Sequence, residues 1–382
     1  MMISRPSLLP LAFLVSIAVD SSASLAVNPL FGQIFEQSTA TLSQARLQFT
    51  STSVENYAMF AGGGNNLGQI QYSTVDIFDS LTGQWSTDSL SHPRSRLAAT
   101  SVGSLALFAG GQSSAGDSDV VDIFDASTGQ WSTDTLSVAR PDLAAAAVGK
   151  FALFAGGRSR NPTVDILDTL TGQWSTAVLS EGRAAPAATS VGNLAIFAGG
   201  VGSGNGFSRT VDMFDSSTGV WSTALLSVGR VELTATSVGD YALFAGGRAN
   251  TGGVSDVVDI FDSKTSLWST ATLSERRTDL AATTVENYAI FGGGGYGGGR
   301  TGSDTVDIFD ATTGVWTTAS LSEGRFSLTA TSAGRYALFA GGLGSGTESM
   351  TVDMFALVPE PTTLLLALAA TLAPLRHRHS RR

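Results

Sequence analysis

Seven arginines recur at one position of an internal repeat, and their side chains are the groups in this sequence best suited to hold a ligand. Each lies 16 positions before the first glycine of a Gly-Gly pair. A guanidinium donates paired hydrogen bonds to carboxylates and phosphates, so seven of them around one opening would favour an anionic ligand. The candidate binding residues are Arg46, Arg94, Arg140, Arg183, Arg230, Arg277 and Arg325.

A second role is open for these arginines, because an aspartate also recurs once in every repeat. Each arginine would then pair with an aspartate inside the fold. The regularity of both sets favours this structural role, since a dedicated ligand site usually breaks the symmetry of its scaffold. The aspartates are Asp76, Asp122, Asp165, Asp212, Asp259, Asp307 and Asp353.

Catalytic and metal chemistry find little support in the composition. The 382 residues include no cysteine and three histidines, of which only His92 lies outside the C-terminal tail. Cysteine-ligated metal, thiol catalysis and a Ser-His-Asp triad are therefore not expected. The glycine run at residues 292–295 precedes no helix, so it is not a phosphate loop. We predict no catalytic residue, no metal site and no cofactor, and the net charge of −10 argues against nucleic acid as a partner.

The chain is built from a repeat of 43 to 48 residues, and such a repeat decides the fold. With 44 glycines and only 14% charged residues, the composition suits short strands joined by tight turns rather than helices. Six tryptophans mark the repeat: Trp85, Trp131, Trp174, Trp221, Trp268 and Trp316. Seven glycine pairs accompany them, at positions 62–63, 110–111, 156–157, 199–200, 246–247, 293–294 and 341–342.

Each unit predicts four strands, as the second copy illustrates. An Ala- and Thr-rich strand at residues 97–102 turns through Gly103 and Ser104 into an apolar strand at residues 105–108. After a loop of variable length, residues 121–124 form a third strand. An Asp-x-x-Thr-Gly turn then leads to the fourth strand around Trp131. The small side chains of the first strand suit the crowded axis of a ring.

A glycine pair, then an aromatic residue, then a tryptophan after six intervening residues resembles the kelch repeat. The pairs are Phe78/Trp85, Phe124/Trp131, Phe214/Trp221, Phe261/Trp268 and Phe309/Trp316, whereas the third unit has Leu167 before Trp174. The other units have Phe where the family usually has Tyr. The resemblance spans about residues 33–355 and implies one four-stranded blade per unit around a central channel.

The kelch resemblance also bears on function. In kelch domains that capture acidic peptides, arginines at the repeated position sit at the channel mouth and hold carboxylates. Copper oxidases with this fold need a cysteine-modified tyrosine, which a chain without cysteine cannot form. Kelch-type sugar mutarotases rely on acid and base residues rather than metals, so this activity stays open as an alternative.

The predicted ring closes through the two ends of the repeat region. The last unit stops after Phe355 and lacks its tryptophan strand, whereas residues 37–43 match residues 268–274 with Gln37 in place of Trp268. We expect this N-terminal strand to complete the last blade, which leaves no unpaired edge between blades. The predicted fold class is all-β, a seven-bladed β-propeller of kelch repeats.

The first 23 residues are typical of a secretory signal peptide. Arg5 supplies a positive start, an apolar run extends from Leu8 to Val19, and small residues follow. Cleavage after Ala23 is expected, with Ala26 as the alternative. The protein is therefore predicted to be exported.

Residues 358–382 form a three-part tail. Pro359, Glu360 and Pro361 are followed by an apolar stretch at residues 362–375 and an arginine-rich end. As a helix this stretch would reach about 21 Å, short for a bilayer core of about 30 Å. The tail resembles the PEP-CTERM sorting signal of Gram-negative bacteria, which implies an exosortase partner, transient membrane contact and onward sorting to the cell surface. A simple C-terminal anchor is the alternative.

These features predict an exported, non-enzymatic module that binds a protein or a polysaccharide at the cell surface or outside the cell. The loops after the glycine pairs carry aromatic, amide and cationic groups suited to sugars: Asn65, Asn66, Tyr72, Asn205, Phe207, Arg209, Tyr296 and Arg300. The alternatives are an architectural matrix protein without a discrete ligand and a mutarotase-like sugar-processing enzyme.

Overall fold

The computed structural model describes residues 35–66, 68–204, 206–250, 252–296 and 301–358. The chain divides into two units, Met1–Gln33 and Ile34–Arg382, and every described residue belongs to the second. The expected signal peptide and the sorting motif Pro359, Glu360 and Pro361 lie outside the described residues. Within the described part of the chain, no helix is long and apolar enough to cross a membrane.

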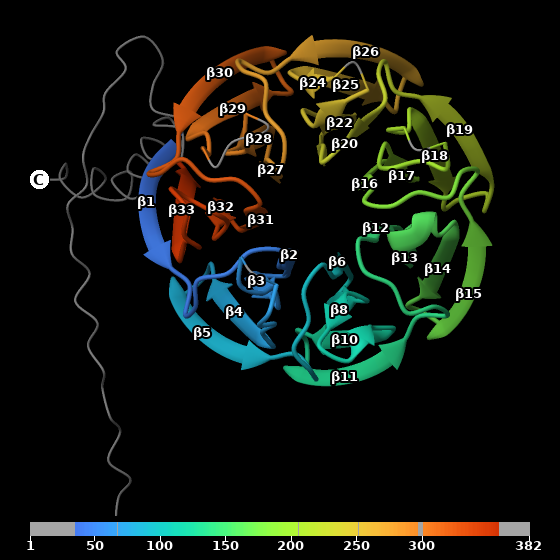
Figure 1. Ribbon diagram of the computed structural model, residues 1–382, viewed down its shortest axis with the longest axis horizontal. Coiled ribbons are helices and arrows are strands. Elements are labelled where there is room, and N and C mark those ends of the chain that lie inside the picture. The colour runs from blue at the N-terminus through green and yellow to red at the C-terminus, as the bar shows by residue number, and fades with distance from the viewer. Residues whose placement is uncertain (1–34, 67, 205, 251, 297–300, 359–382) are drawn as a thin grey trace, which may run out of the picture. The chain divides into compact units, whose positions relative to one another are not determined.

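The described chain is all-β and consists mainly of four-stranded antiparallel sheets. Seven such sheets occur among the described residues (Figure 1), numbered here in chain order. Sheet 1 contains β2 (Thr50–Val54), β3 (Tyr57–Ala61), β4 (Thr74–Asp79) and β5 (Gln84–Ser89); sheet 2 contains β6 (Ala98–Val102), β7 (Leu105–Ala109), β10 (Val120–Asp125) and β11 (Gln130–Thr135). Sheet 3 contains β12 (Ala144–Val148), β13 (Phe151–Ala155), β14 (Thr163–Asp168) and β15 (Gln173–Val178); sheet 4 contains β16 (Ala187–Val191), β17 (Leu194–Ala198), β18 (Thr210–Asp215) and β19 (Trp221–Leu225).

The remaining sheets follow the same plan, except that the last one uses both ends of the described chain. Sheet 5 contains β21 (Thr234–Val238), β22 (Tyr241–Ala245), β25 (Val257–Asp262) and β26 (Leu267–Thr272); sheet 6 contains β27 (Ala281–Val285), β28 (Tyr288–Gly292), β29 (Thr305–Asp310) and β30 (Val315–Ser320). Sheet 7 contains β31 (Thr329–Ala333), β32 (Tyr336–Ala340), β33 (Thr351–Leu357) and β1 (Phe35–Thr41). Short elements in the loops are β8 (Gln112–Ser113), β9 (Gly116–Asp117), β20 (Arg230–Val231), β23 (Arg248–Ala249), β24 (Gly253–Val254) and the 3-10 turn η1 (Arg158–Arg160).

The hydrophobic core lies between consecutive sheets. The second strand of each sheet is buried along almost its whole length, whereas the fourth is mostly exposed. In one cluster, Leu107 of sheet 2 packs with Phe154 and Leu167 of sheet 3. The paired aromatic residues of the repeat also meet: Phe124 and Trp131 have ring centroids 5.2 Å apart. Each sheet therefore buries its apolar faces against its neighbours, as layered β structures must.

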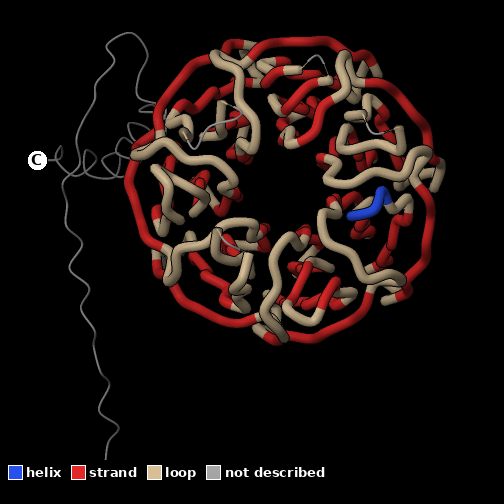
Figure 2. Tube along the Cα trace, viewed as in Figure 1, coloured by secondary structure: helices blue, strands red, loops and turns tan. Residues whose placement is uncertain are grey.

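The sheets are joined in sequence through their first strands and through one repeated backbone hydrogen bond. The first strands β2, β6, β12, β16, β21, β27 and β31 contact one another consecutively, and β31 also contacts β2. They are drawn innermost in Figure 1, and Figure 2 shows the same trace with loops between the strands. The second glycine of every pair donates its N–H to the carbonyl of the arginine in the next sheet, at 2.8–3.2 Å, and Gly342 donates to Arg46. This β-propeller-like arrangement confirms the predicted all-β class with repeated four-stranded sheets.

The N-terminal strand pairs with the C-terminal one. β1 runs antiparallel to β33 over seven residue pairs, from Phe35 opposite Leu357 to Thr41 opposite Thr351. The sequence match placed this strand at residues 37–43, and the observed strand begins and ends two residues earlier.

Candidate functional site

All seven repeated arginines are buried and pair with the repeated aspartates. Their exposure is 0–1% for the whole residue, and each guanidinium contacts the aspartate of its own sheet. The two separations of ordinary length are 2.6 Å for Arg46–Asp76 and 2.7 Å for Arg140–Asp165. The pairing that the sequence left open is therefore the one that the structure contains.

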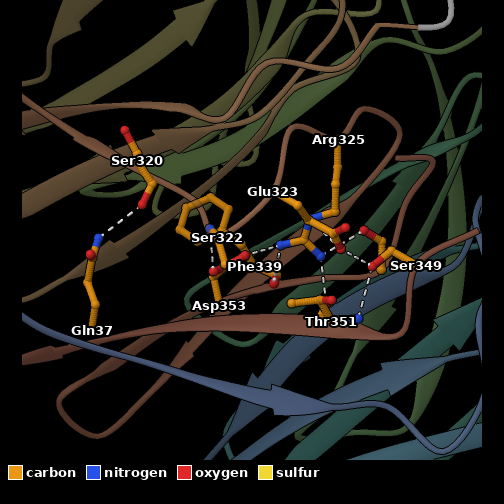
Figure 3. A network of polar contacts seen from close by, with 10 residues as sticks. Gln37, Ser320, Ser322, Glu323, Arg325, Phe339, Ser349, Thr351 and Asp353 are labelled. Carbon is orange, nitrogen blue, oxygen red and sulfur yellow. Dashed lines mark hydrogen bonds and ion pairs between the residues drawn. The ribbon is translucent and has the colours of Figure 1, made fainter. Parts of the chain in front are cut away.

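Figure 3 shows the network in sheet 7. Arg325 Nη1 donates to the carbonyls of Thr351 at 2.6 Å and Gly341 at 3.1 Å, and Nη2 donates to Asp353. The other oxygen of Asp353 accepts the backbone N–H of Ser322 at 2.8 Å. One aspartate thus holds both an arginine and the loop that carries it. Equivalent backbone N–H contacts to the aspartate, at 2.8–2.9 Å, occur in every sheet.

Burial lowers the pKa of several of these arginines. Loss of water around the guanidinium lowers the pKa of Arg325, and the nearby Asp353 and Glu323 act in the opposite direction. Burial lowers the pKa of Arg183 in the same way against Asp212 and Glu181. A buried charge is tolerated only when it is paired and hydrogen-bonded, and the aspartate supplies that pairing.

Direct ligand binding by the seven arginines stays a prediction. In the described structure their side chains are at most 2% exposed, and their contacts are those of a structural ion pair. Six of them keep a buried Nε–H without a hydrogen-bond partner, and Arg46 keeps an unpaired Nη1 as well. Access for a ligand would require these loops to move.

A different set of residues distinguishes one sheet from the next. Two residues before each first strand, a non-glycine residue has a positive φ between 50° and 59°. We call these the left-handed residues: Gln48, Arg96, Asp142, Ala185, Glu232, Asp279 and Ser327. A side chain in this conformation costs roughly 1–2 kcal/mol, and glycine would avoid the cost. The side chains at these positions are therefore kept at a cost in backbone strain.

The left-handed residues are neighbours in space. Backbone N–H to carbonyl hydrogen bonds of 2.8–3.1 Å connect them from sheet 1 through sheet 4 and from sheet 5 through sheet 7. They lie at one end of the first strands, which contact one another. All seven are exposed or half-buried. The set therefore forms a surface of two hydrogen-bonded runs at that end, one on sheets 1 to 4 and one on sheets 5 to 7.

Charge is unevenly distributed over this surface. Asp142 lies 3.6 Å from Arg96 and 3.5 Å from Arg158, and Arg96 donates to Gln48 at 3.3 Å. On sheets 5 and 6, Glu232 accepts a hydrogen bond from Thr278 at 2.8 Å. Two arginines therefore share the carboxylate of Asp142 on sheets 2 and 3, whereas on sheets 5 and 6 the carboxyl groups of Glu232 and Asp279 lie near the single arginine Arg248, 3.9 Å from Glu232.

Asp279 is the most perturbed of the described carboxyl groups. Burial, together with the nearby charge of Glu232, raises its pKa to about 7, and Arg248 acts in the opposite direction. In an unfolded chain the pKa of aspartate is about 3.9. The folded state thus binds the proton more tightly, and its stability falls as pH rises from about 4 to about 7.

We expect Asp279→Asn to stabilise the protein at pH 8, by on the order of 2 kcal/mol, and to bring no such gain at pH 4. Urea unfolding at the two pH values measures the difference. Asp142→Asn is the matched control, because Asp142 occupies the equivalent position beside two arginines and should show no gain at pH 8. A gain for Asp279→Asn that is equal at both pH values would contradict the assignment.

Several loop residues that the sequence offered for sugar contact also hydrogen-bond within the fold. The Asn250 side chain donates to the carbonyl of Phe207 and accepts its N–H, both at 2.7 Å, which joins the loops of sheets 4 and 5. Glu348 accepts the N–H of Asn66 at 2.5 Å, which joins sheets 7 and 1. Tyr296 donates to Glu275 at 3.1 Å but stays 48% exposed.

The other loop candidates have local partners or are not described. The Asn65 side chain accepts two backbone N–H groups of its own loop, and Arg209 donates to the carbonyl of Leu226 at 2.9 Å. The N–H of Tyr72 donates to the carbonyl of Gly63 at 2.8 Å. Asn205 and Arg300 lie outside the described residues. Among the residues that the structure covers, no group of three or more His, Cys, Asp or Glu side chains could hold a metal ion.

Comparison with known proteins adds no family assignment. No protein-family model matches the chain, and no curated protein sequence matches it either. The functional conclusions below therefore depend on the residues and contacts of this chain.

Proposed function

We propose that the chain is a seven-bladed kelch-type β-propeller completed by β1, and that it is an exported, non-enzymatic module that binds a protein or a polysaccharide. Two features support the architecture. The same arginine–aspartate pair occurs within every sheet, and the same glycine-to-arginine backbone bond joins each sheet to the next, sheet 7 to sheet 1 included.

The proposal of a binding function depends on the left-handed residues. The arginines and aspartates are alike in every sheet and pair with one another, whereas the left-handed positions hold seven side chains of six types. Retaining side chains where glycine would be less strained points to a use outside the fold. Their mixture of guanidinium, carboxylate, amide and hydroxyl groups suits a polar partner such as a polysaccharide or an extended protein segment.

The experiment is a binding screen of the full chain against a glycan array and candidate surface proteins, followed by glycine substitutions. We expect Arg96→Gly and Glu232→Gly to weaken binding about tenfold or more by removing polar contacts, while stability rises by up to about 1 kcal/mol. Ala185→Gly is the matched control, because it makes the same backbone change and removes only a methyl group. It should gain stability without losing affinity.

Two results would overturn this proposal. If Arg96→Gly and Glu232→Gly bind as well as the unchanged protein, the left-handed residues are not the site. If no glycan or protein binds at all, the binding function fails, and an architectural role becomes the better account.

We further propose that the protein is exported through residues 1–23 and held transiently at the membrane through residues 358–382, with an exosortase-type enzyme as partner. The order of the Pro-Glu-Pro motif, the apolar stretch and the arginine-rich end supports this proposal. The described fold ends at Val358, directly before the motif. Removing the tail should therefore leave every described strand intact.

Truncation after Val358 is expected to release the protein into the medium. Cell fractionation and immunoblotting measure the shift, and Pro359→Ala with Pro361→Ala in the full-length chain tests the motif alone. Unchanged localisation of the truncated chain would show that the tail is not the sorting determinant.

A further inference from the structure

β1 is an unusual strand because its partner comes from the opposite end of the described chain. In sheets 1 to 6, the four strands come from one stretch of the chain, and each strand pairs with the one before it and the one after it in that sheet. In sheet 7, by contrast, β1 pairs only with β33, in the register Glu36 opposite Ala356. Figure 1 shows β1 in blue beside β33 in red.

Few buried contacts hold β1 in place. Of its seven residues, only Phe35 is buried and only Ala40 is half-buried. Phe35 packs against Tyr288 and Phe355, with ring centroids 5.4 and 6.3 Å apart. Most of the attachment is therefore the backbone ladder to β33.

Gln37 weakens this attachment compared with other sheets. Where an outer strand carries its tryptophan after a repeat phenylalanine, the two rings lie 5.0–5.3 Å apart. Gln37 occupies the corresponding place in β1 and makes one hydrogen bond, to the carbonyl of Ser320 at 3.1 Å. A hydrogen bond at an exposed position contributes less than a packed indole ring.

The junction of sheets 7 and 1 differs from the other junctions in two details. Arg46 is the only repeated arginine with two buried N–H groups that lack a partner among the described residues. Its carbonyl accepts the longest of the seven glycine-to-arginine bonds, at 3.2 Å from Gly342.

The ribosome synthesises β1 and β33 at different times. The chain is made from its N-terminus, so β1 exists before any of the sheets, and β33 is the last of the described strands to be completed. Pairing across such a long separation in sequence is slow to form. Until the two strands pair, β1 presents an unpaired strand edge, and so does β33 once it has been made. Such an edge is a template for pairing with another chain.

We propose that β1 also pairs with β33 of a second copy of this chain, so that copies are joined by strand exchange. The exchanged contact uses the same backbone bonds and the same Phe35 packing as the contact within one copy, so its register would be identical. Each copy would give one β1 and accept another. This contact is head-to-tail, and it closes into rings or extends into chains. The inference goes beyond the proposed binding function, since it provides an assembly route that a surface layer would use.

The test uses two full-length chains with one cysteine each, which is possible because the natural sequence has none. Glu36→Cys and Ala356→Cys chains are unfolded together and refolded at raised concentration under mild oxidation. Glu36 and Ala356 are paired in register, so exchange brings the two introduced thiols within disulfide reach. We expect a disulfide-linked heterodimer, with the link between positions 36 and 356 identified by mass spectrometry.

Gln37→Cys mixed with Ala356→Cys is the matched control. Gln37 is opposite Phe355, so its side chain points to the other face of the sheet from residue 356. The heterodimer yield should be several-fold lower in this mixture. Equal yields, or monomers alone from chains that refold normally by circular dichroism, would overturn strand exchange while leaving the proposed ligand binding untouched.

Discussion

Replacing Arg183 with methionine is expected to lower the free energy of unfolding by about 3–5 kcal/mol, because the change leaves Asp212 charged and buried without its partner. Arg183 is fully buried, and besides Asp212 it donates to the carbonyl of Phe197 at 3.1 Å and to that of Thr210. Urea unfolding followed by tryptophan fluorescence measures the loss. An equally large loss is expected for the same change at Arg230.

Two variants decide whether this loss comes from the buried pair. Arg183→Met combined with Asp212→Asn removes the unpaired charge, so the double variant should be more stable than Arg183→Met alone. Arg276→Met is the exposed control: its side chain is 72% exposed and lies 3.5 Å from Asp256, and its loss should stay below about 1 kcal/mol. If Arg183→Met folds with unchanged stability and loses only ligand binding, the arginines are a binding site rather than structural pairs.

Deleting residues 35–41 is expected to have the second large effect. The deletion removes the ladder between β1 and β33 together with the burial of Phe35, a loss on the order of 3–6 kcal/mol. It also exposes β33 as an unpaired edge, so we expect aggregation at concentrations where the full chain stays monomeric. Thermal unfolding and light scattering measure the two effects.

A synthetic peptide covering residues 34–43 provides the matching rescue. Added in excess, it should restore part of the lost unfolding temperature by pairing with β33. A peptide with Phe35→Ser should restore much less, because Phe35 is the only buried residue of the strand. Full stability of the deleted chain without peptide would mean that β1 does not help to hold the sheets together.

The repeat made much of the fold predictable from sequence. Short apolar strands, Gly-Ser turns and the aromatic–tryptophan spacing all act locally, so the strands around residues 97–108 and 121–131 appear where they were predicted. The arginine–aspartate pairing was also foreseeable, because both residues recur in step. Its burial was not, since sequence spacing alone does not reveal whether a guanidinium faces water.

The left-handed residues escaped prediction for a physical reason. In a sequence, glycine is the usual indication of a positive φ, whereas Arg96, Glu232 and Asp279 look like ordinary surface residues. The one available signal was that this position varies among repeats that otherwise match. The loop contacts escaped for another reason: Asn250 and Phe207 meet only because the fold brings two separate loops together.

A disulfide within a single copy tests most directly whether β1 pairs with β33 of the same chain. Glu36→Cys with Ala356→Cys in one chain should form the disulfide on mild oxidation at low concentration, keep the mass of a monomer and raise the unfolding temperature. Gln37→Cys with Ala356→Cys should stay reduced. Free thiols at positions 36 and 356 in the oxidised, folded monomer, or equal linking in both variants, would contradict the claim.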